Sequence, residues 1–282
     1  MRRRSCTLSR LVGQTLLGKT LATLLSLIIW IGLWYLASSR LNKPLLLPSP
    51  VEVARRILAL SATASFWKYS FLSLLRVMGG ILIGIFTATV TAALTSLSSL
   101  FHTLISPLIV TVKTTPVASF IILAMLWVNE GILPMFISFL IVFPVVWSNL
   151  HTALTNVPSA YLDVCDVFRL PLSRRIRRVY LPFILPHLLS ACHSSLGLAW
   201  KAGIAAEAIA LPAISIGKQL MESKIYLETT DLFAWTVVVI ILSLLLEMVA
   251  DAIFRQLKAR AAHAPDAMEQ SANIGRSHYA GA

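Results

Sequence analysis

Residues whose types could carry out chemistry are few in this chain, and their spacing argues against catalysis. The cysteines, Cys6, Cys165 and Cys192, have neither the spacing of a metal site nor that of a disulfide pair. No convergent cluster of His, Asp and Ser side chains stands out in the sequence. We therefore expect no catalytic residues and no metal site in this chain, and we do not expect it to be an enzyme.

One short motif, GQTLLGKT at Gly13–Thr20, fits the phosphate-loop pattern G-x-x-x-x-G-K-[ST]. That loop works when a strand feeds glycine-rich backbone amides into a helix N-terminus, where they surround phosphates. Here no strand pattern precedes the motif, and an apolar run follows it at once. The segment is predicted to be a basic turn beside a membrane span, and no cofactor is expected in this chain.

Two charged residues, Lys201 and Glu207, interrupt the apolar run from Phe183 to Leu211. On a helix they are about 9 Å apart along the axis. Charges inside a membrane are costly and usually face the protein interior or a water-filled cavity. One interpretation is a substrate pathway in which Lys201 attracts an anionic solute, with Glu207 nearby. The alternative is pairing with other helices, or snorkelling of the side chain to the interface.

The longest polar segment between the two apolar halves runs from Tyr161 to Pro186 and holds five arginines and two aspartates. Such a segment must lie in water or against a soluble partner. Tyr161–Arg169 can form a short helix that ends before Pro171, because the residue before proline disfavours helix. A second helix, capped by Ser173, is expected to end near Pro182 or to lead into the next span there.

The elements around these residues are those of a membrane protein. The chain has 282 residues, of which 57% are hydrophobic and 13% charged, with a mean hydropathy of +0.80. Soluble domains carry roughly 25% charged residues, so the composition predicts an all-α integral membrane protein. The excess of 24 Lys and Arg over 12 Asp and Glu is typical of loops that face anionic lipid. No nucleic-acid partner is expected.

Six transmembrane helices are predicted from the apolar runs, each about long enough to span a bilayer. Gly79, Gly80 and Gly84 have the small-residue spacing that lets two helices approach closely. Pro116 is expected to break the third helix. Before the second span, Ser49 can cap a short amphipathic helix that lies on the membrane or packs on the spans. The expected spans are residues 20–39, 71–95, a helix from about 102, and residues 132–151, 183–211 and 232–253, with a polar loop at 212–231.

Charge predicts the orientation of these spans. With the N-terminus inside, the inner segments hold fourteen Lys and Arg and the outer segments seven. Because positive residues favour the cytoplasmic side, both termini and the central loop are expected in the cytoplasm. The predicted domains are a basic cytoplasmic N-terminus at 1–19, a transmembrane domain at 20–255 and a disordered cytoplasmic tail at 256–282.

The loop at 158–182 resembles the EAA motif in permease subunits of binding-protein-dependent ABC importers. That motif reads E-A-A, three residues, G, nine residues, I-x-L-P. This chain has Asp163-Val164-Cys165, then Arg169, then Val179-Tyr180-Leu181-Pro182 at the same spacing. The main departure is Arg169, because the family's glycine can end a helix in the left-handed conformation and arginine does so less easily. We expect Pro171 to stop the helix instead.

Other stretches resemble the nitrate/sulfonate/taurine-type branch of these permeases: LPSPVEV at 47–53, SLLRVMGG at 73–80 and AWKAGIAAE at 199–207. The resemblance implies a six-span permease in the cell membrane, working as a homodimer. It implies two ATP-binding-cassette ATPase subunits, which bind the ATP, and an extracytoplasmic substrate-binding protein. The residues expected to couple this chain to the ATPase are Asp163, Val164, Cys165, Val167, Phe168, Arg169, Leu181 and Pro182.

The transported solute is expected to be small and anionic or polar, and the sequence does not identify it. The alternative function is a secondary transporter without an ATPase partner. Its mark would be two halves of similar hydropathy, which the sequence does not show clearly.

Overall fold

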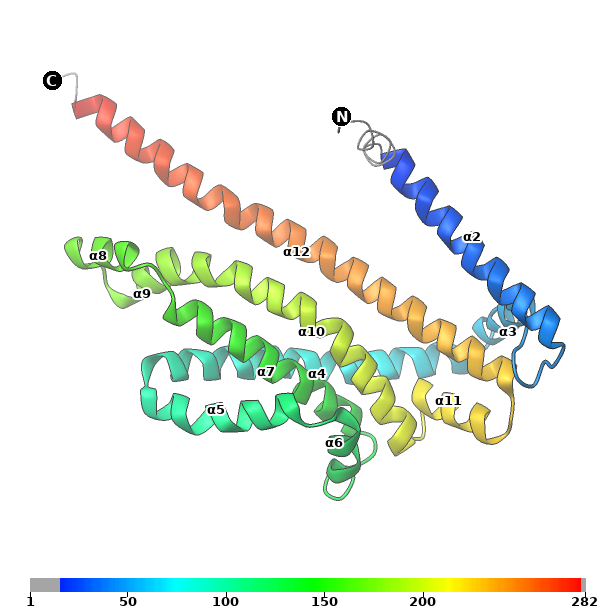
Figure 1. Cartoon of the computed structure of the whole chain (residues 1–282). Helices are drawn as coiled ribbons and strands as arrows, with labels where there is room; N and C mark the ends of the chain where they lie inside the picture. The colour runs from blue at the N-terminus through cyan, green and yellow to red at the C-terminus, as the bar shows by residue number, and fades with distance from the viewer. Residues whose placement is uncertain (1–15, 280–282) are drawn as a thin grey trace, which may run out of the picture.

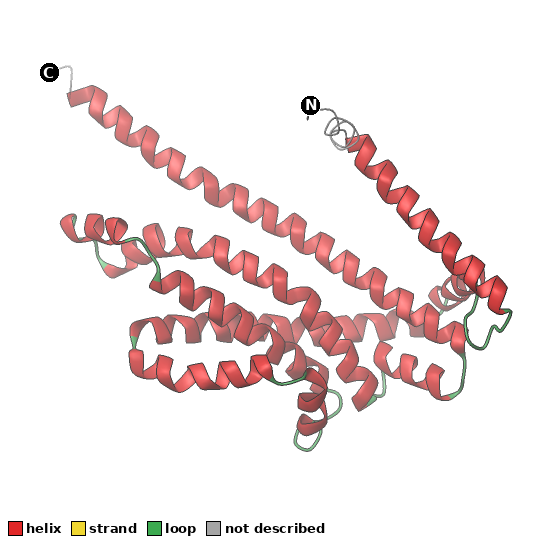
Figure 2. Ribbon diagram, viewed as in Figure 1, coloured by secondary structure: helices red, strands yellow, loops and turns green. Residues whose placement is uncertain are grey.

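The computed structural model describes residues 16–279, and every secondary structure element in that range is a helix (Figures 1 and 2). Figure 1 labels them α2 to α12 in chain order, with a short π-helix before α10. Their bounds are α2 Leu16–Leu41, α3 Pro50–Ser61, α4 Ala64–Leu97, α5 Ser99–Thr114, α6 Val117–Ala124, α7 Leu133–Thr155, α8 Ser159–Val167, α9 Leu172–Arg175, the π-helix Ile176–Tyr180, α10 Leu181–Ala210, α11 Ile216–Ile225 and α12 Thr229–Tyr279.

Five helical segments within the described range are long and apolar enough to cross a membrane. A sixth span is formed if α5 and α6 are taken together, since these two helices are separated by a bend of 106°. The bend falls where the chain reads Thr115-Pro116, so the broken third span predicted from Pro116 is confirmed. The predicted class, an all-α membrane protein of about six spans, is confirmed as well.

The core forms where α4, α7 and α10 pack together. Glycines allow the close approach: a Cβ on Gly80 would lie 2.1 Å from the Met135 carbonyl oxygen, and one on Gly203 would lie 2.5 Å from the Val77 side chain. Inside a membrane the hydrophobic effect does not drive helices together. Small residues favour association instead, because they let the backbones approach and pack closely. The sequence prediction for the glycines of α4 is confirmed, and α7 is the helix that approaches them.

The two ends of the bundle carry different short helices (Figure 1). At one end lie α8, α9 and the C-terminal end of α12. At the opposite end lie α3, α11 and the connection between α6 and α7. The long helices between them therefore connect one set of surface helices to the other.

The short helix predicted after Ser49 is α3. The Ser49 hydroxyl accepts a hydrogen bond from the Glu52 backbone N–H, and the Glu52 carboxylate accepts one from the Ser49 N–H. This capping box lowers the pKa of Glu52 through its hydrogen bonds to Ser49. Val53 is buried and α3 packs on α12, so the helix is fastened to the spans.

Three expectations about element boundaries have different outcomes, and the first is corrected. The polar loop expected at 212–231 contains α11, which begins where the Ser215 hydroxyl accepts a hydrogen bond from the Lys218 N–H. Of the two outcomes expected at Pro182, entry into the next span is the one found: the π-helix Ile176–Tyr180 runs directly into α10, and Pro182 lies in its first turn. Helix α12 has the bounds Thr229–Tyr279, and the cytoplasmic, disordered tail expected at 256–282 stays a prediction.

Candidate functional site

The central polar loop forms a helical hairpin, α8 followed by α9, at one end of the bundle (Figure 1). Helix α8 begins after Pro158, and Ser159 is its first residue. Helix α9 likewise follows Pro171 without a capping bond from Ser173. In both cases proline sets the extended backbone that precedes the helix.

Arg169 ends α8 in the left-handed conformation, with φ of 46°. The Leu170 N–H donates to the Cys165 carbonyl at 2.9 Å, and the Arg169 N–H donates to the Asp166 carbonyl at 3.1 Å. These two bonds define the Schellman ending that a glycine normally provides. The expectation that Pro171 would replace the left-handed turn is therefore wrong, because arginine adopts the glycine conformation and the turn geometry of the motif is kept.

An ion pair fastens α8 to the helix that follows it. The Arg175 guanidinium pairs with the Asp166 carboxylate and also donates from Nε to the Leu170 carbonyl at 3.0 Å. One side chain thus bridges both sides of the turn at Arg169. Sequence reasoning did not single out this pair, although an acid and an arginine flanking a proline turn are a recognisable signal.

The predicted coupling residues divide into an exposed set and a packed one. Val167 is 78% exposed and Phe168 70% exposed, and Val164 lies on the same exposed surface. Cys165 is only 1% exposed, so it is the packed member of α8. Leu181 and Pro182 lie at the start of α10. The hairpin therefore presents an apolar knob of Val164, Val167 and Phe168 to its surroundings, supported by a buried cysteine.

Lys201 and Glu207 lie on different faces of α10. Lys201 is exposed, whereas the Glu207 side chain has no exposed surface. Six residues turn a helix by about 600°, which separates the two side chains by a third of a turn. The idea that they act side by side in one pathway is therefore not supported by their geometry.

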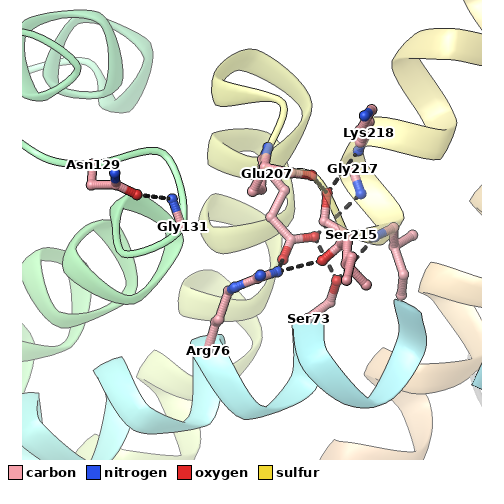
Figure 3. A network of polar contacts seen from close by, with 11 residues as sticks. Ser73, Arg76, Asn129, Gly131, Glu207, Ser215, Gly217 and Lys218 are labelled. Carbon is pink, nitrogen blue, oxygen red and sulfur yellow. Dashed lines mark hydrogen bonds and ion pairs between the residues drawn. The ribbon is translucent and has the colours of Figure 1, made fainter. Parts of the chain in front are cut away.

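Glu207 joins α10 to α4 and to the start of α11 (Figure 3). Its carboxylate accepts hydrogen bonds from the Ser73 hydroxyl at 2.7 Å and the Gly217 N–H at 3.2 Å, and it pairs with Arg76 at 3.5 Å. Arg76 in turn donates to the Ile214 carbonyl at 2.7 Å. A buried carboxylate requires such partners. Interior pairing, the second interpretation offered for Glu207, describes this geometry.

Ser73 also accepts the Ile216 N–H at 2.9 Å, so one hydroxyl contacts both Glu207 and the first turn of α11. Sequence reasoning missed this role of Ser73 and the helix α11 that it holds. The available signal was the spacing of Ser73 and Arg76, which places two polar side chains on one face of an otherwise apolar helix.

The phosphate-loop match is not built as a loop in the part that the structure describes. Residues 13–15 lie outside the described range, and Leu16–Thr20 form the first turns of α2. Because Leu16 and Leu17 are already helical, the described residues between the two glycines do not form the loop of amides that a phosphate requires.

Comparison with known proteins places these features in a family. Residues 80–263 match the model of the family described as "binding-protein-dependent transport system inner membrane component". A probable ABC transporter permease protein of Brucella melitensis is 26% identical over 235 residues, which cover 83% of this chain and 94% of that protein.

Two further relatives carry substrate names. The taurine transport system permease protein of Escherichia coli is 26% identical over 244 residues, covering 84% of this chain and 86% of that protein. A putative aliphatic sulfonates transport permease protein of Bacillus subtilis is 23% identical over 193 residues, covering 68% and 70%.

The family match decides between the two transporter classes considered from the sequence. It covers more than half of the chain, and a binding-protein-dependent system leaves ATP to a separate ATPase. A secondary transporter is thereby set aside. With its helical spans and its motif-bearing hairpin, the chain belongs to the family of binding-protein-dependent transport system inner membrane components, as a non-catalytic permease subunit of an ABC transporter.

Proposed function

We propose that this permease works as a homodimer with two ATP-binding-cassette subunits, and that the α8–α9 hairpin is where each ATPase docks. The observation that supports this most strongly is the exposed apolar knob of Val164, Val167 and Phe168. Large exposed apolar side chains beside charged ones are typical of a surface that meets a soluble partner. Asp163 and Arg169 are exposed beside the knob and are proposed to contact the same partner.

The hairpin can transmit force because its parts are joined rigidly. The Arg175 bridge joins α8 to the last residue of α9, and helix then continues without a break through the π-helix into α10. Movement of α8 would therefore move α10 with it. A partner can shift the balance of two conformations only by contacting them differently, and ATP-dependent closure of the ATPase pair would supply that difference.

We propose a small anionic solute as substrate. The relatives named for taurine and for aliphatic sulfonates carry substrates with a sulfonate group. In this chain, exposed Lys201 in the α10 span supports an anion, since a cation at that depth needs a polar surrounding. Glu207 is not proposed as a pathway residue, because its carboxylate already has partners within the chain.

The docking proposal is tested by Phe168→Glu. A charge on the apolar knob should abolish co-purification of the ATPase in mild detergent, while the spans stay folded because Phe168 is 70% exposed. The measurement is the ratio of ATPase to permease in the purified complex, together with the elution profile of the permease alone.

The matched control is Tyr226→Glu. Tyr226 is 72% exposed and follows α11 at the opposite end of the bundle (Figure 1). This variant introduces the same charge and should leave the ATPase ratio unchanged. Normal co-purification of Phe168→Glu would show that α8 is not the docking site.

A further inference from the structure

Helix α11 is fastened to two spans by the backbone of its first turn (Figure 3). A helix leaves its first N–H groups without partners inside the helix. In α11 the Ile216 N–H donates to the Ser73 hydroxyl of α4 at 2.9 Å. The Gly217 N–H donates to the Glu207 carboxylate of α10 at 3.2 Å, and the positive end of the helix dipole favours a carboxylate there. The bonds that hold this end of α11 therefore come from other helices.

The Glu207 carboxylate also has partners that do not belong to α11. It accepts a hydrogen bond from the Ser73 hydroxyl and lies 3.5 Å from Arg76, so these contacts join α4 to α10 whether or not α11 is in place. Three contacts reach the α11 side: the two N–H groups of the first turn, and the Ile214 carbonyl, which accepts from Arg76 at 2.7 Å. A displacement of α11 would break these three together and leave the buried carboxylate paired.

Strained backbone marks both ends of α11. Leu211, which ends α10, has φ of 57°, and Leu227, which follows α11, has φ of 59°. Two of the four described non-glycine residues with positive φ thus flank this one helix. For a bulky side chain this conformation is an outlier, and it persists only where the surrounding structure holds it. Such strain is found at switch regions, and here it lies where a hinge on either side of α11 would turn.

Helix α10 connects these contacts to the α8–α9 hairpin. Helix is continuous from Leu172 through the π-helix and α10 to Ala210. From Leu181 to Glu207 the helix rises about 39 Å at 1.5 Å per residue. Movement of the hairpin is therefore delivered to Glu207, at the end of the bundle where α11 lies (Figure 1).

We propose that α11 is a two-position element, and that Glu207 is the positioning residue that links its position to the movement of α10. In the position that the structure shows, the first turn of α11 is held by Ser73 and Glu207, and we call these contacts the latch. In the other position Leu211 and Leu227 relax to ordinary backbone angles and α11 leaves the latch as a unit.

A shift of α10 changes the distance between the Glu207 carboxylate and the Gly217 N–H. Packed contacts respond to such a shift by switching between two arrangements, because they do not deform continuously. The link to ATP rests on the proposed function, in which the ATPase moves α10 through the hairpin.

The test measures hydrogen exchange in the peptide that contains the first turn of α11. The permease is purified with its ATPase and binding protein in lipid nanodiscs, and exchange is followed by mass spectrometry with and without a non-hydrolysable ATP analogue. The amides of Ile216 and Gly217 should exchange at rates that differ by about 10-fold between the two conditions, the upper range for the net loss of one hydrogen bond. Equal rates in a complex that contains its ATPase would overturn the link to α10.

Ser73→Ala removes the hydroxyl that contacts both Glu207 and the Ile216 N–H. Without nucleotide, exchange in the first turn of α11 should become about 10-fold faster. The ratio of binding-protein-stimulated to basal ATP hydrolysis should fall toward one, while the ATPase still co-purifies. The matched control is Ser70→Ala. Ser70 lies one turn earlier on α4, is also buried, and has a hydroxyl without a hydrogen-bond partner among the described residues, so neither exchange nor the ratio should change.

Leu211→Gly should act in the opposite direction. Glycine adopts the left-handed conformation without strain, so the latched position gains stability and exchange in the first turn of α11 should become about 3-fold slower. This substitution removes no hydrogen bond of the latch, so it tests the same element with the network intact.

Exchange in Leu211→Gly that is not slower, or a Ser73→Ala complex that behaves like Ser70→Ala, would overturn the two-position element. Normal co-purification of Phe168→Glu would refute the docking hairpin. Exchange that ignores nucleotide in a complex that contains its ATPase would refute the latch alone, so the two failures are distinguishable.

Discussion

Arg169 is the residue at which this chain departs most from its motif. Its left-handed backbone is strained, and neighbouring hydrogen bonds offset that strain. A residue with a Cβ in the left-handed region is strained by about 1–2 kcal/mol relative to glycine. Two hydrogen bonds of the Schellman ending, from the N–H groups of Arg169 and Leu170, offset that strain. The bridge from Arg175 to Asp166 and Leu170 holds the same turn closed.

We predict that Arg169→Gly stabilises the end of α8 by about 1 kcal/mol, because glycine removes the left-handed strain and keeps both hydrogen bonds. The measurement is hydrogen exchange of the amides at Arg169 and Leu170 in the purified permease. Arg169→Ala is the control, since it removes the same side chain but keeps a Cβ. Equal protection in the glycine and alanine variants would contradict the assignment of strain to Arg169.

At the scale of elements, the contact between α10 and α11 depends on the absence of one side chain. A Cβ on Gly217 would lie 2.3 Å from the Glu207 Cβ and 2.4 Å from the Ala208 backbone nitrogen. Helix α11 therefore approaches α10 at backbone distance, and the Gly217 N–H can reach the Glu207 carboxylate. The Ser73 hydroxyl completes the contact from α4.

Gly217→Ala is expected to lower stability by about 1–3 kcal/mol, since the added methyl group must displace backbone and not a flexible side chain. The measurement is thermal unfolding of the permease in detergent. Gly32→Ala is the matched control: Gly32 lies in α2 with no atom within 4 Å of an added Cβ, so the higher helix propensity of alanine should leave stability unchanged or slightly raised. A similar effect at both glycines would contradict the close contact.

At the scale of the whole molecule, the separation of α8 from α11 at opposite ends makes the orientation testable (Figure 1). We predict that the hairpin and both termini face the cytoplasm, because Lys and Arg concentrate there. In a background without native cysteines, an impermeant maleimide should label Tyr226→Cys in intact cells. Leu172→Cys, equally exposed, should be labelled only after permeabilisation, and the reverse pattern would place the hairpin outside.

Much of the architecture could be predicted because the signals for membrane spans lie close together in the sequence. Long apolar runs, the glycine spacing of α4 and the proline at the α5–α6 bend each act within a few turns. The α8–α9 hairpin was also predictable, since its motif spacing and prolines lie within 25 residues. The segment that forms α11 was predicted to be a loop because it is polar. It is helical because Ser215 caps its first turn and the buried Ser73 hydroxyl accepts a hydrogen bond from the Ile216 N–H.

The sequence by itself determined the class of the protein, its spans, its family resemblance and the position of the α8–α9 hairpin, because those depend on composition and short-range spacing. Only the tertiary structure decided the roles of the intramembrane charges. Lys201 and Glu207 are neighbours in sequence, yet Glu207 pairs with a residue 131 positions away and Lys201 faces outward. A charge is satisfied by whatever lies beside it in space, and for a helix buried among others those neighbours come from distant parts of the chain.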